Sequence, residues 1–179
     1  MDAIIALPGI NGSGEGHWQT LWERRNPAIR RFRPSDWDRP EREDWMRALD
    51  EAVAGAAAPP LLLAHSLACL LVAHWAAGAG RRIRGAFLVS VPDPDGPRFP
   101  REAASFGAPP AAPLPFPALI VASTDDPYGT LDHAHRRAAQ WGAGFVVAGP
   151  LGHINESSGL GDWPQGAALF EAFRAGTRG

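Results

Sequence analysis

An apolar run with one polar corner occupies residues 61–72, which read Leu61-Leu62-Leu63-Ala64-His65-Ser66-Leu67-Ala68-Cys69-Leu70-Leu71-Val72. The first part is typical of a buried strand and the second of a buried helix, so Ser66 is predicted at a strand-to-helix turn. The residues two before and two after this serine, Ala64 and Ala68, are both small. Small-x-Ser-x-small at such a turn is typical of a nucleophile elbow, in which the chain folds back closely and presents the serine hydroxyl.

Both small positions of this turn hold alanine, where glycine is the common choice. Two extra methyl groups in so tight a turn can strain it by about 1 kcal/mol or more. The pattern also arises by chance in alanine-rich chains. Its functional interpretation therefore depends on which residues follow the other predicted strands.

Short apolar runs alternate with longer helical patterns along the sequence. Strands are predicted at residues 3–7, 29–33, 61–64, 84–90, 118–122 and 145–148. Helices are predicted from Trp18 to before Pro27, at residues 41–55, 66–77 and 131–141, and in the last part of the chain. This alternation is typical of a parallel sheet with helices on both faces. The predicted fold is α/β, with three α/β/α layers and about six parallel strands.

Two segments lead to more detailed predictions. Asp162 and Gln165 have the spacing of a capping box, which places the start of the last helix at Asp162. That helix is expected to bury Leu169, Phe170 and Phe173. The proline-rich residues 91–117 are too long and too broken for a tight turn, so we expect them to lie over the surface, as a pocket wall or as an irregular excursion.

Length and charge limit the classes of function. A chain of 179 residues buries roughly 70% of its unfolded surface, and we expect residues 1–179 to form one domain. The net charge of -2 gives no electrostatic preference for nucleic acid or for an anionic membrane, so neither is an expected partner. The sequence contains no lysine, which excludes Schiff-base catalysis by lysine and the phosphate-binding lysine of a P-loop.

The single cysteine, Cys69, lies in the apolar run after Ser66 and can form no internal disulfide. It is expected to be a small buried core residue in a protein from a reducing compartment. The apolar run at residues 3–7 is too short for the core of a signal peptide and has no basic lead. Together these observations favour a cytoplasmic location.

Side chains suited to acyl transfer follow three different predicted strands. Ser66 follows the third, Asp125 and Asp126 follow the fifth, and His153 follows the sixth. Serine, aspartate and histidine in this chain order match the α/β-hydrolase triad. A serine hydroxyl needs an imidazole to take its proton, and the imidazole needs a carboxylate to orient it. Asp125-Asp126-Pro127 alone is also typical of a simple turn, and the pattern leaves both aspartates open.

The predicted first strand ends in Pro8-Gly9-Ile10-Asn11-Gly12-Ser13-Gly14, a turn with free amide groups. The amide of Ile10, together with that of Leu67 after the serine, would form a two-donor oxyanion hole. The glycine spacing differs from Gly-x-Gly-x-x-Gly, and no acidic residue ends the second strand, which disfavours a dinucleotide-binding loop.

The remaining histidines and tryptophans have simpler interpretations. His133 and His135 are two residues apart on a predicted helix and do not share a face, so we expect solvated surface positions and not a metal pair. Packing is the expected role of His65 and His74. The tryptophans Trp18, Trp22 and Trp75 are expected in the core first and in pocket walls second. No metal or organic cofactor is expected.

Four segments carry motifs. They are Pro8-Gly9-Ile10-Asn11-Gly12-Ser13-Gly14-Glu15-Gly16-His17-Trp18-Gln19-Thr20-Leu21-Trp22, His65-Ser66-Leu67-Ala68-Cys69-Leu70, Ser123-Thr124-Asp125-Asp126-Pro127-Tyr128 and Gly152-His153-Ile154-Asn155-Glu156-Ser157-Ser158-Gly159. Together they resemble the small serine hydrolases of the retinoblastoma-binding-protein-nine and YdeN type, over nearly the whole chain. The His-Trp-Gln and Gly-His-Ile-Asn signatures are more specific than the serine turn alone.

This resemblance implies a reduced α/β-hydrolase fold with strand order 2-1-3-4-5-6 and no large cap domain. It implies Ser66 as nucleophile, His153 as base and Asp126 as acid, since the family's acid immediately precedes proline. The expected function is hydrolysis of a small ester or amide through an acyl-serine intermediate, by a carboxylesterase or an amidase. Two alternatives stay open: a catalytically weak binding or scaffold protein with this fold, and an acyltransferase or thioesterase that uses the same residues.

Overall fold

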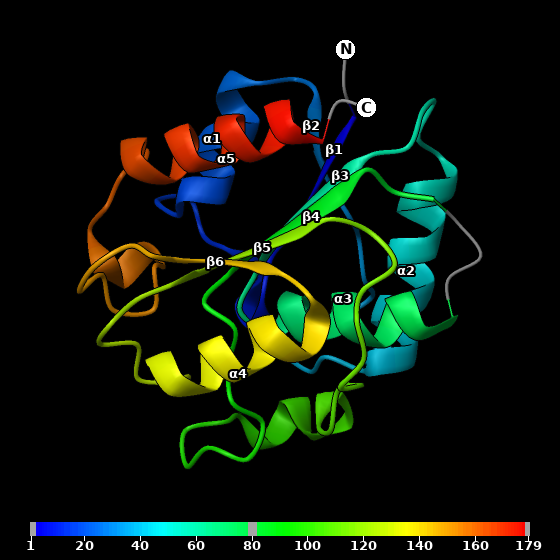
Figure 1. Ribbon diagram of the computed structural model, residues 1–179. Coiled ribbons are helices and arrows are strands. Elements are labelled where there is room, and N and C mark those ends of the chain that lie inside the picture. The colour runs from blue at the N-terminus through cyan, green and yellow to red at the C-terminus, as the bar shows by residue number, and fades with distance from the viewer. Residues whose placement is uncertain (1–2, 79–81, 178–179) are drawn as a thin grey trace.

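A computed structural model of the protein describes residues 3–78 and 82–177 (Figure 1). One parallel sheet contains β1 (Ile4–Leu7), β2 (Ile29–Arg31), β3 (Leu61–His65), β4 (Gly85–Val89), β5 (Ala118–Ala122) and β6 (Gly144–Val147). The strand order β2-β1-β3-β4-β5-β6 confirms the expected one. The order reverses between β1 and β3, which is where open α/β sheets bind their ligands.

Helices cover both faces of the sheet, as the alternation predicted (Figure 1). The α-helices are α1 (Trp18–Arg25), α2 (Arg42–Ala54), α3 (Leu67–Gly78), α4 (Leu131–Trp141) and α5 (Pro164–Gly176), and the short 3-10 helices are η1 (Ile10–Gly12), η2 (Arg101–Phe106) and η3 (Glu156–Ser158). Helices α1 and α5 pack on one face, while α2, α3 and α4 pack on the other. The fold is therefore three-layered, and the described residues contain no large cap.

The centre of the molecule is the strand and helix on either side of Ser66. All five residues of β3 are buried, because the strand has neighbours on both edges and helices on both faces. Helix α3 is apolar on nearly every side and is buried from Leu67 to Ala73. Cys69 is fully buried in this helix, as predicted. A helix with no polar face must be enclosed, and α3 is covered by the sheet, by α2 and by η2.

The prediction for the start of the last helix was wrong. Helix α5 begins at Pro164, and its cap residue Trp163 has a left-handed backbone (φ 44°) and makes no side-chain capping bond. Asp162 instead forms an ion pair with Arg25 of α1. Proline suits the first helical position because its missing N–H would have no partner there. Of the three side chains expected to be buried, only Phe170 is buried, while Leu169 and Phe173 are half-buried.

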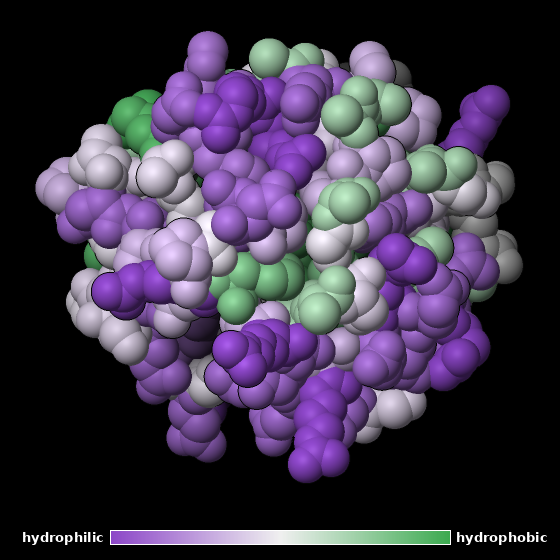
Figure 2. Space-filling model, turned by 90° about the horizontal axis from the view of Figure 1, so that it is seen from below, coloured by the Kyte–Doolittle hydropathy of each residue, from purple (hydrophilic) through white to green (hydrophobic). Residues whose placement is uncertain are grey.

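The proline-rich connection between β4 and β5 contains η2 and passes below the sheet in Figure 1. The face seen from below is mostly hydrophilic, with a small group of hydrophobic residues near its centre (Figure 2). Phe106, at the end of η2, is fully buried against the core and anchors the connection. In residues 3–78 and 82–177, no helix has the length and apolarity needed to cross a membrane.

Candidate active site

Ser66 lies at the turn between β3 and α3, and its backbone is left-handed (φ 55°). This conformation is unfavourable for a residue with a side chain and is tolerated where the surroundings fix it. Ala64 and Ala68 are fully buried beside it, so both methyl groups fit within the turn. The space comes instead from Gly9 after β1: a Cβ atom there would lie 3.0 Å from the Cβ of Ser66.

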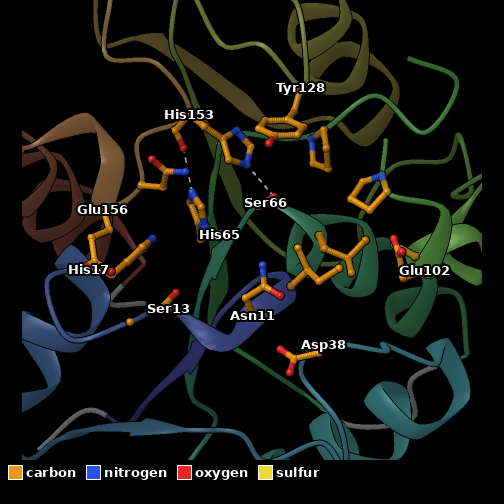
Figure 3. A pocket seen from close by; sticks show the side chains of 18 of the residues that line it. Asn11, Ser13, His17, Asp38, His65, Ser66, Glu102, Tyr128, His153 and Glu156 are labelled. Atoms are coloured by element: carbon orange, nitrogen blue, oxygen red, sulfur yellow. Dashed lines mark hydrogen bonds between the residues drawn. The ribbon is translucent and has the colours of Figure 1, made fainter. Parts of the chain in front are cut away.

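The structure brings Ser66, His153 and Asp126 into one chain of hydrogen bonds. The Nε2 atom of His153 is 2.7 Å from the Oγ of Ser66 (Figure 3). On the other side of the ring, Nδ1 is 2.8 and 2.9 Å from the two carboxylate oxygens of Asp126. Because a carboxylate only accepts, Nδ1 carries the proton and the unprotonated Nε2 accepts from the serine hydroxyl. The three residues, Ser66, His153 and Asp126, are 7%, 8% and 9% exposed, so the chain is shielded from water.

The two neighbouring aspartates have different contacts. Asp126 bonds to His153, and its Oδ1 also accepts from the amide of Tyr128 at 2.9 Å. Asp125 accepts from the Ser123 hydroxyl and from the amide of Gly152, both at 2.7 Å. These two bonds hold the pKa of Asp125 below its usual range, with Ser123 the larger cause. Asp125 therefore holds the loop before His153 in place through hydrogen bonds that no sequence motif indicated.

The predicted oxyanion-hole residues, Ile10 and Leu67, both line the pocket that contains Ser66. Ile10 is the first residue of η1, and Leu67 is the first residue of α3. Amide groups at these positions have no acceptor within their own helix. Gly9 approaches the amide of Leu67 closely, since a Cβ atom at Gly9 would lie 3.4 Å from that nitrogen. This approach brings the two helix starts together.

The pocket has a volume of about 630 Å³. His153 and Tyr128 lie beside Ser66, while Asp38 and Glu102 lie on the opposite side (Figure 3). The proline-rich connection contributes to the wall through Pro92, Phe99, Pro100, Glu102 and Ala103. This finding confirms the pocket-wall interpretation of residues 91–117.

Two further histidines are buried in a row beside His153: the ring of His65 lies against that of His153, and the ring of His17 lies against that of His65. His65 is 5% exposed, and its Nε2 is 2.9 Å from the backbone carbonyl of His153. His17 is 3% exposed and caps α1, because its Nδ1 accepts from the amide of Gln19. Burial, with smaller effects of the Arg31 and His153 charges, lowers the pKa of His17 to about 3. Burial also lowers the pKa of His65 well below its usual range, so both rings are neutral at neutral pH.

The expectation for the histidine pair on α4 was wrong for one member. His133 is 3% exposed, and its Nδ1 lies 3.5 Å from Oδ1 of Asp93. His135 is exposed, as predicted. The spacing showed that the two do not share a face, but not that one face would pack inward. Within residues 3–78 and 82–177, no group of three or more histidine, cysteine or acidic side chains is arranged to hold a metal ion.

Comparisons with known proteins agree with the fold and the family. The family model described as "Serine hydrolase" matches residues 4–172. A sequence search of curated proteins gives no match to this chain.

Solved structures show the same fold. A protein described as a YdeN-like hydrolase, from Pectobacterium atrosepticum, is 29% identical with a TM-score of 0.88, and the match covers 98% of this chain and 91% of that one. The YdeN gene product of B. subtilis is 20% identical with a TM-score of 0.81 over 98% and 100% of the two chains. Est1E from Butyrivibrio proteoclasticus, solved with ferulic acid bound, is 12% identical with a TM-score of 0.70 over 98% and 87%. The last two matches, both of low identity, support the fold alone.

Proposed function

The chain belongs to the serine hydrolase family, and from this premise we propose that it cleaves a small ester or amide through an acyl-serine intermediate. Ser66 is the proposed nucleophile, His153 the base, and Asp126 the carboxylate that orients the base. The observation that carries the proposal is the continuous bonding from Asp126 to Nδ1 and from Nε2 to the serine hydroxyl.

In the proposed mechanism, the Oγ of Ser66 attacks the substrate carbonyl while Nε2 of His153 takes the hydroxyl proton. The resulting imidazolium is stabilised by Asp126 and then gives the proton to the leaving alcohol or amine. The oxyanion accepts from the amides of Ile10 and Leu67, and loss of one such donor costs about two to three orders of magnitude in rate. Water, activated by His153, releases the acyl group from Ser66.

The pocket supports a small, uncharged or cationic substrate. Its volume of about 630 Å³ lies within the range of small-molecule sites. Three carboxylates, of Asp38, Glu102 and Glu156, line it against the one guanidinium of Arg39. This excess of negative charge disfavours an acyl group on an anionic carrier arm and so disfavours the thioesterase alternative. A cytoplasmic location belongs to the same proposal, because the single Cys69 is a free thiol.

Covalent labelling with a fluorophosphonate tests the proposal. Intact mass is measured after incubation of folded wild type, Ser66→Ala, His153→Ala and heat-denatured protein with the probe. We expect one adduct on folded wild type, mapped by peptide analysis to Ser66, and no adduct on the other three samples. An unlabelled wild type, beside a reactive serine hydrolase in the same tube, would contradict the mechanism and favour a binding or scaffold protein.

The acyl acceptor separates hydrolysis from transfer. Turnover of a short-chain ester is followed with and without added alcohol or amine acceptors. Free acid as the main product at all acceptor concentrations supports a hydrolase. Acylated acceptor as the main product would instead identify an acyltransferase that uses the same residues.

A further inference from the structure

The loop that carries His153, residues 148–155 between β6 and η3, is called the base loop. Two consecutive backbone carbonyls in it are bonded to buried side chains from distant parts of the chain. The carbonyl of His153 accepts from Nε2 of His65 at 2.9 Å (Figure 3). The carbonyl of Ile154 accepts from the indole Nε1 of Trp18 at 2.8 Å. The donors, His65 and Trp18, are 5% and 1% exposed, so water does not compete for either bond.

The backbone of this loop is unfavourable without such partners. Ile154 has a φ of 46°, in the left-handed region. A β-branched residue rarely adopts a left-handed backbone, and it does so only where the surrounding contacts enforce the conformation. The two bonded carbonyls belong to the peptide groups on either side of the Cα atom of Ile154, so the hydrogen bonds from His65 and Trp18 supply that enforcement.

The donors connect the base to the other parts of the site. His65 directly precedes Ser66 on β3, so its bond ties the base loop to the strand that carries the nucleophile. Trp18 lies at the start of α1 and does not line the pocket, so it acts on His153 through the loop backbone and through its ring contact with His65. A third hydrogen bond, from the Gly16 amide to the Glu156 carboxylate at 3.1 Å, joins the residues just before α1 to the residue just after His153-Ile154-Asn155.

We propose that Trp18 and His65 are positioning residues that hold the imidazole of His153 within hydrogen-bond distance of Ser66. The effect on rate rests on the proposed function, because it requires Ser66 to be the nucleophile. The effect on the geometry of His153 does not. This arrangement also gives a physical reason for the joint presence of the His-Trp-Gln and Gly-His-Ile-Asn motifs. The first motif supplies the indole donor of Trp18, and the second supplies the Ile154 carbonyl that accepts from it.

Helix α1 offers a matched control for Trp18. Trp22 lies one turn later, is also buried, and donates its indole N–H to the carbonyl of Asp162 at 2.7 Å. Asp162 and Trp22 line a different cavity, away from Ser66. Trp18→Phe and Trp22→Phe therefore remove the same group and the same type of bond, but only the first bond reaches the base loop.

The expected result is a loss of rate in one variant only. Trp18→Phe should lower kcat for a short-chain ester by about tenfold or more with little change in KM, since a displacement of about 1 Å can cost that much. Trp22→Phe should stay within about twofold of wild type. Melting temperatures should fall by similar amounts in both variants. Equal kcat values in the two variants would overturn the proposal.

His65 is tested by conservative rescue. In His65→Gln the side-chain amide can reach the position of Nε2 and still donate to the carbonyl of His153, whereas His65→Leu fills the space without a donor. We expect kcat to be retained within about fivefold in the first variant and lost by about tenfold or more in the second. Equal losses in both would show that only the packing of the ring matters.

A spectroscopic measurement separates this proposal from the proposed function. The proton between Nδ1 of His153 and Asp126 gives a far-downfield ¹H NMR signal that depends on ring geometry and not on turnover. We expect this signal to broaden or shift in Trp18→Phe and to persist in Trp22→Phe. An unchanged signal in Trp18→Phe would overturn the positioning role even if the enzyme is active. If wild type fails to react with the fluorophosphonate, the proposed function fails, and the signal alone decides the positioning role.

Discussion

Ser66 and Ser90 occupy equivalent places at the ends of neighbouring strands and differ in what surrounds them. Ser66 directly follows β3 and Ser90 directly follows β4. Their backbones are left-handed to the same degree, with φ of 55° and 56°, and both residues are buried. The backbone amide of each serine donates to a carbonyl near the end of the next strand of the sheet. The acceptor is Val89 of β4 for Ser66 and Val121 of β5 for Ser90.

The hydroxyl groups of these two serines have different partners. The Oγ of Ser66 is bonded to His153 and faces the pocket, whereas the Oγ of Ser90 is buried with no hydrogen-bond partner in the described structure. A helix follows Ser66 directly, and the irregular proline-rich connection follows Ser90. A strained serine at a strand end is therefore not sufficient for the site proposed at Ser66, which also has an imidazole partner, free amide groups and a pocket.

The largest expected difference between Ser66 and Ser90 is the loss of activity when each hydroxyl group is removed. Ser66→Ala should reduce kcat/KM for an ester by about 10⁴-fold or more, because removal of a serine nucleophile leaves only binding and oxyanion stabilisation. Ser90→Ala should stay within about twofold of wild type. Steady-state hydrolysis at matched protein concentrations measures both. Comparable losses in the two variants would show that the two strand ends are not functionally different.

The neighbouring aspartates extend the comparison to the end of β5. Asp126→Asn should lower kcat by about 10⁴-fold, because the amide no longer holds His153 in the tautomer that accepts from Ser66. Asp125→Asn should lower it by about tenfold at most, since Asp125 affects His153 only through the loop before it, by the Gly152 amide and by Ser123. Single-turnover kinetics of both variants decides the matter, and a larger effect at Asp125 would exchange the two assignments.

Two buried neutral imidazoles, of His17 and His65, line the pocket that contains Ser66, and they predict a stability that depends on pH. The folded pKa of His17, about 3, is below its unfolded value, so the unfolded chain binds a proton first as the pH falls. The stabilisation is present above about pH 6.5 and is lost toward pH 3, by up to about 1.4 kcal/mol per pH unit for this residue. His17→Asn keeps an acceptor for the Gln19 amide but does not titrate.

Urea unfolding of both proteins at several pH values between about 4 and 7.5 tests this linkage. The free energy of unfolding should fall less steeply with decreasing pH in His17→Asn than in wild type. His65 contributes to both curves, and the effect of its burial, which is the main cause of its lowered pKa, cancels in the difference. Parallel curves would show that His17 is already solvated in the folded protein.

The smallest expected effect concerns the unpaired hydroxyl of Ser90. An unsatisfied buried hydroxyl costs about 1 kcal/mol or more, so Ser90→Ala should raise the free energy of unfolding by about that amount. Ser66→Ala should show no such gain, because its hydroxyl is bonded to His153. Chemical denaturation at neutral pH measures both changes. A destabilised Ser90→Ala would indicate that this hydroxyl has a partner in solution.

Much of the fold followed from short-range patterns. The apolar run at residues 61–72 predicted β3, the turn and α3, because so many consecutive apolar residues are typical of elements that are buried on all sides. The strand order came from family resemblance and was confirmed. The start of α5 was mispredicted because the capping-box spacing of Asp162 and Gln165 competes with a long-range ion pair to Arg25, which no local pattern contains.

The site was predictable to the extent that its residues follow strands. Ser66, Asp126 and His153 each follow a predicted strand and lie in contact. The bonds that tie Trp18 and His65 to the base loop join residues 136 and 88 positions apart, so spacing could not indicate them. Likewise, a local motif could not show that Gly9 provides the space that alanine at both elbow positions would otherwise remove.

The connection between β4 and β5 also bears on how proteins of this kind diverge. Residues 90–117 cross over the sheet with η2 in place of an α-helix, and they supply one wall of the pocket but none of the proposed catalytic groups. Doubling the length of a flexible surface connection costs only about 0.6 kcal/mol in chain entropy. Insertions there would enlarge or reshape this wall of the pocket while the strands, the turn at Ser66 and the loop that carries His153 stay in place. The shape of the pocket can thus change through one segment that carries no proposed catalytic group, while the sheet stays folded.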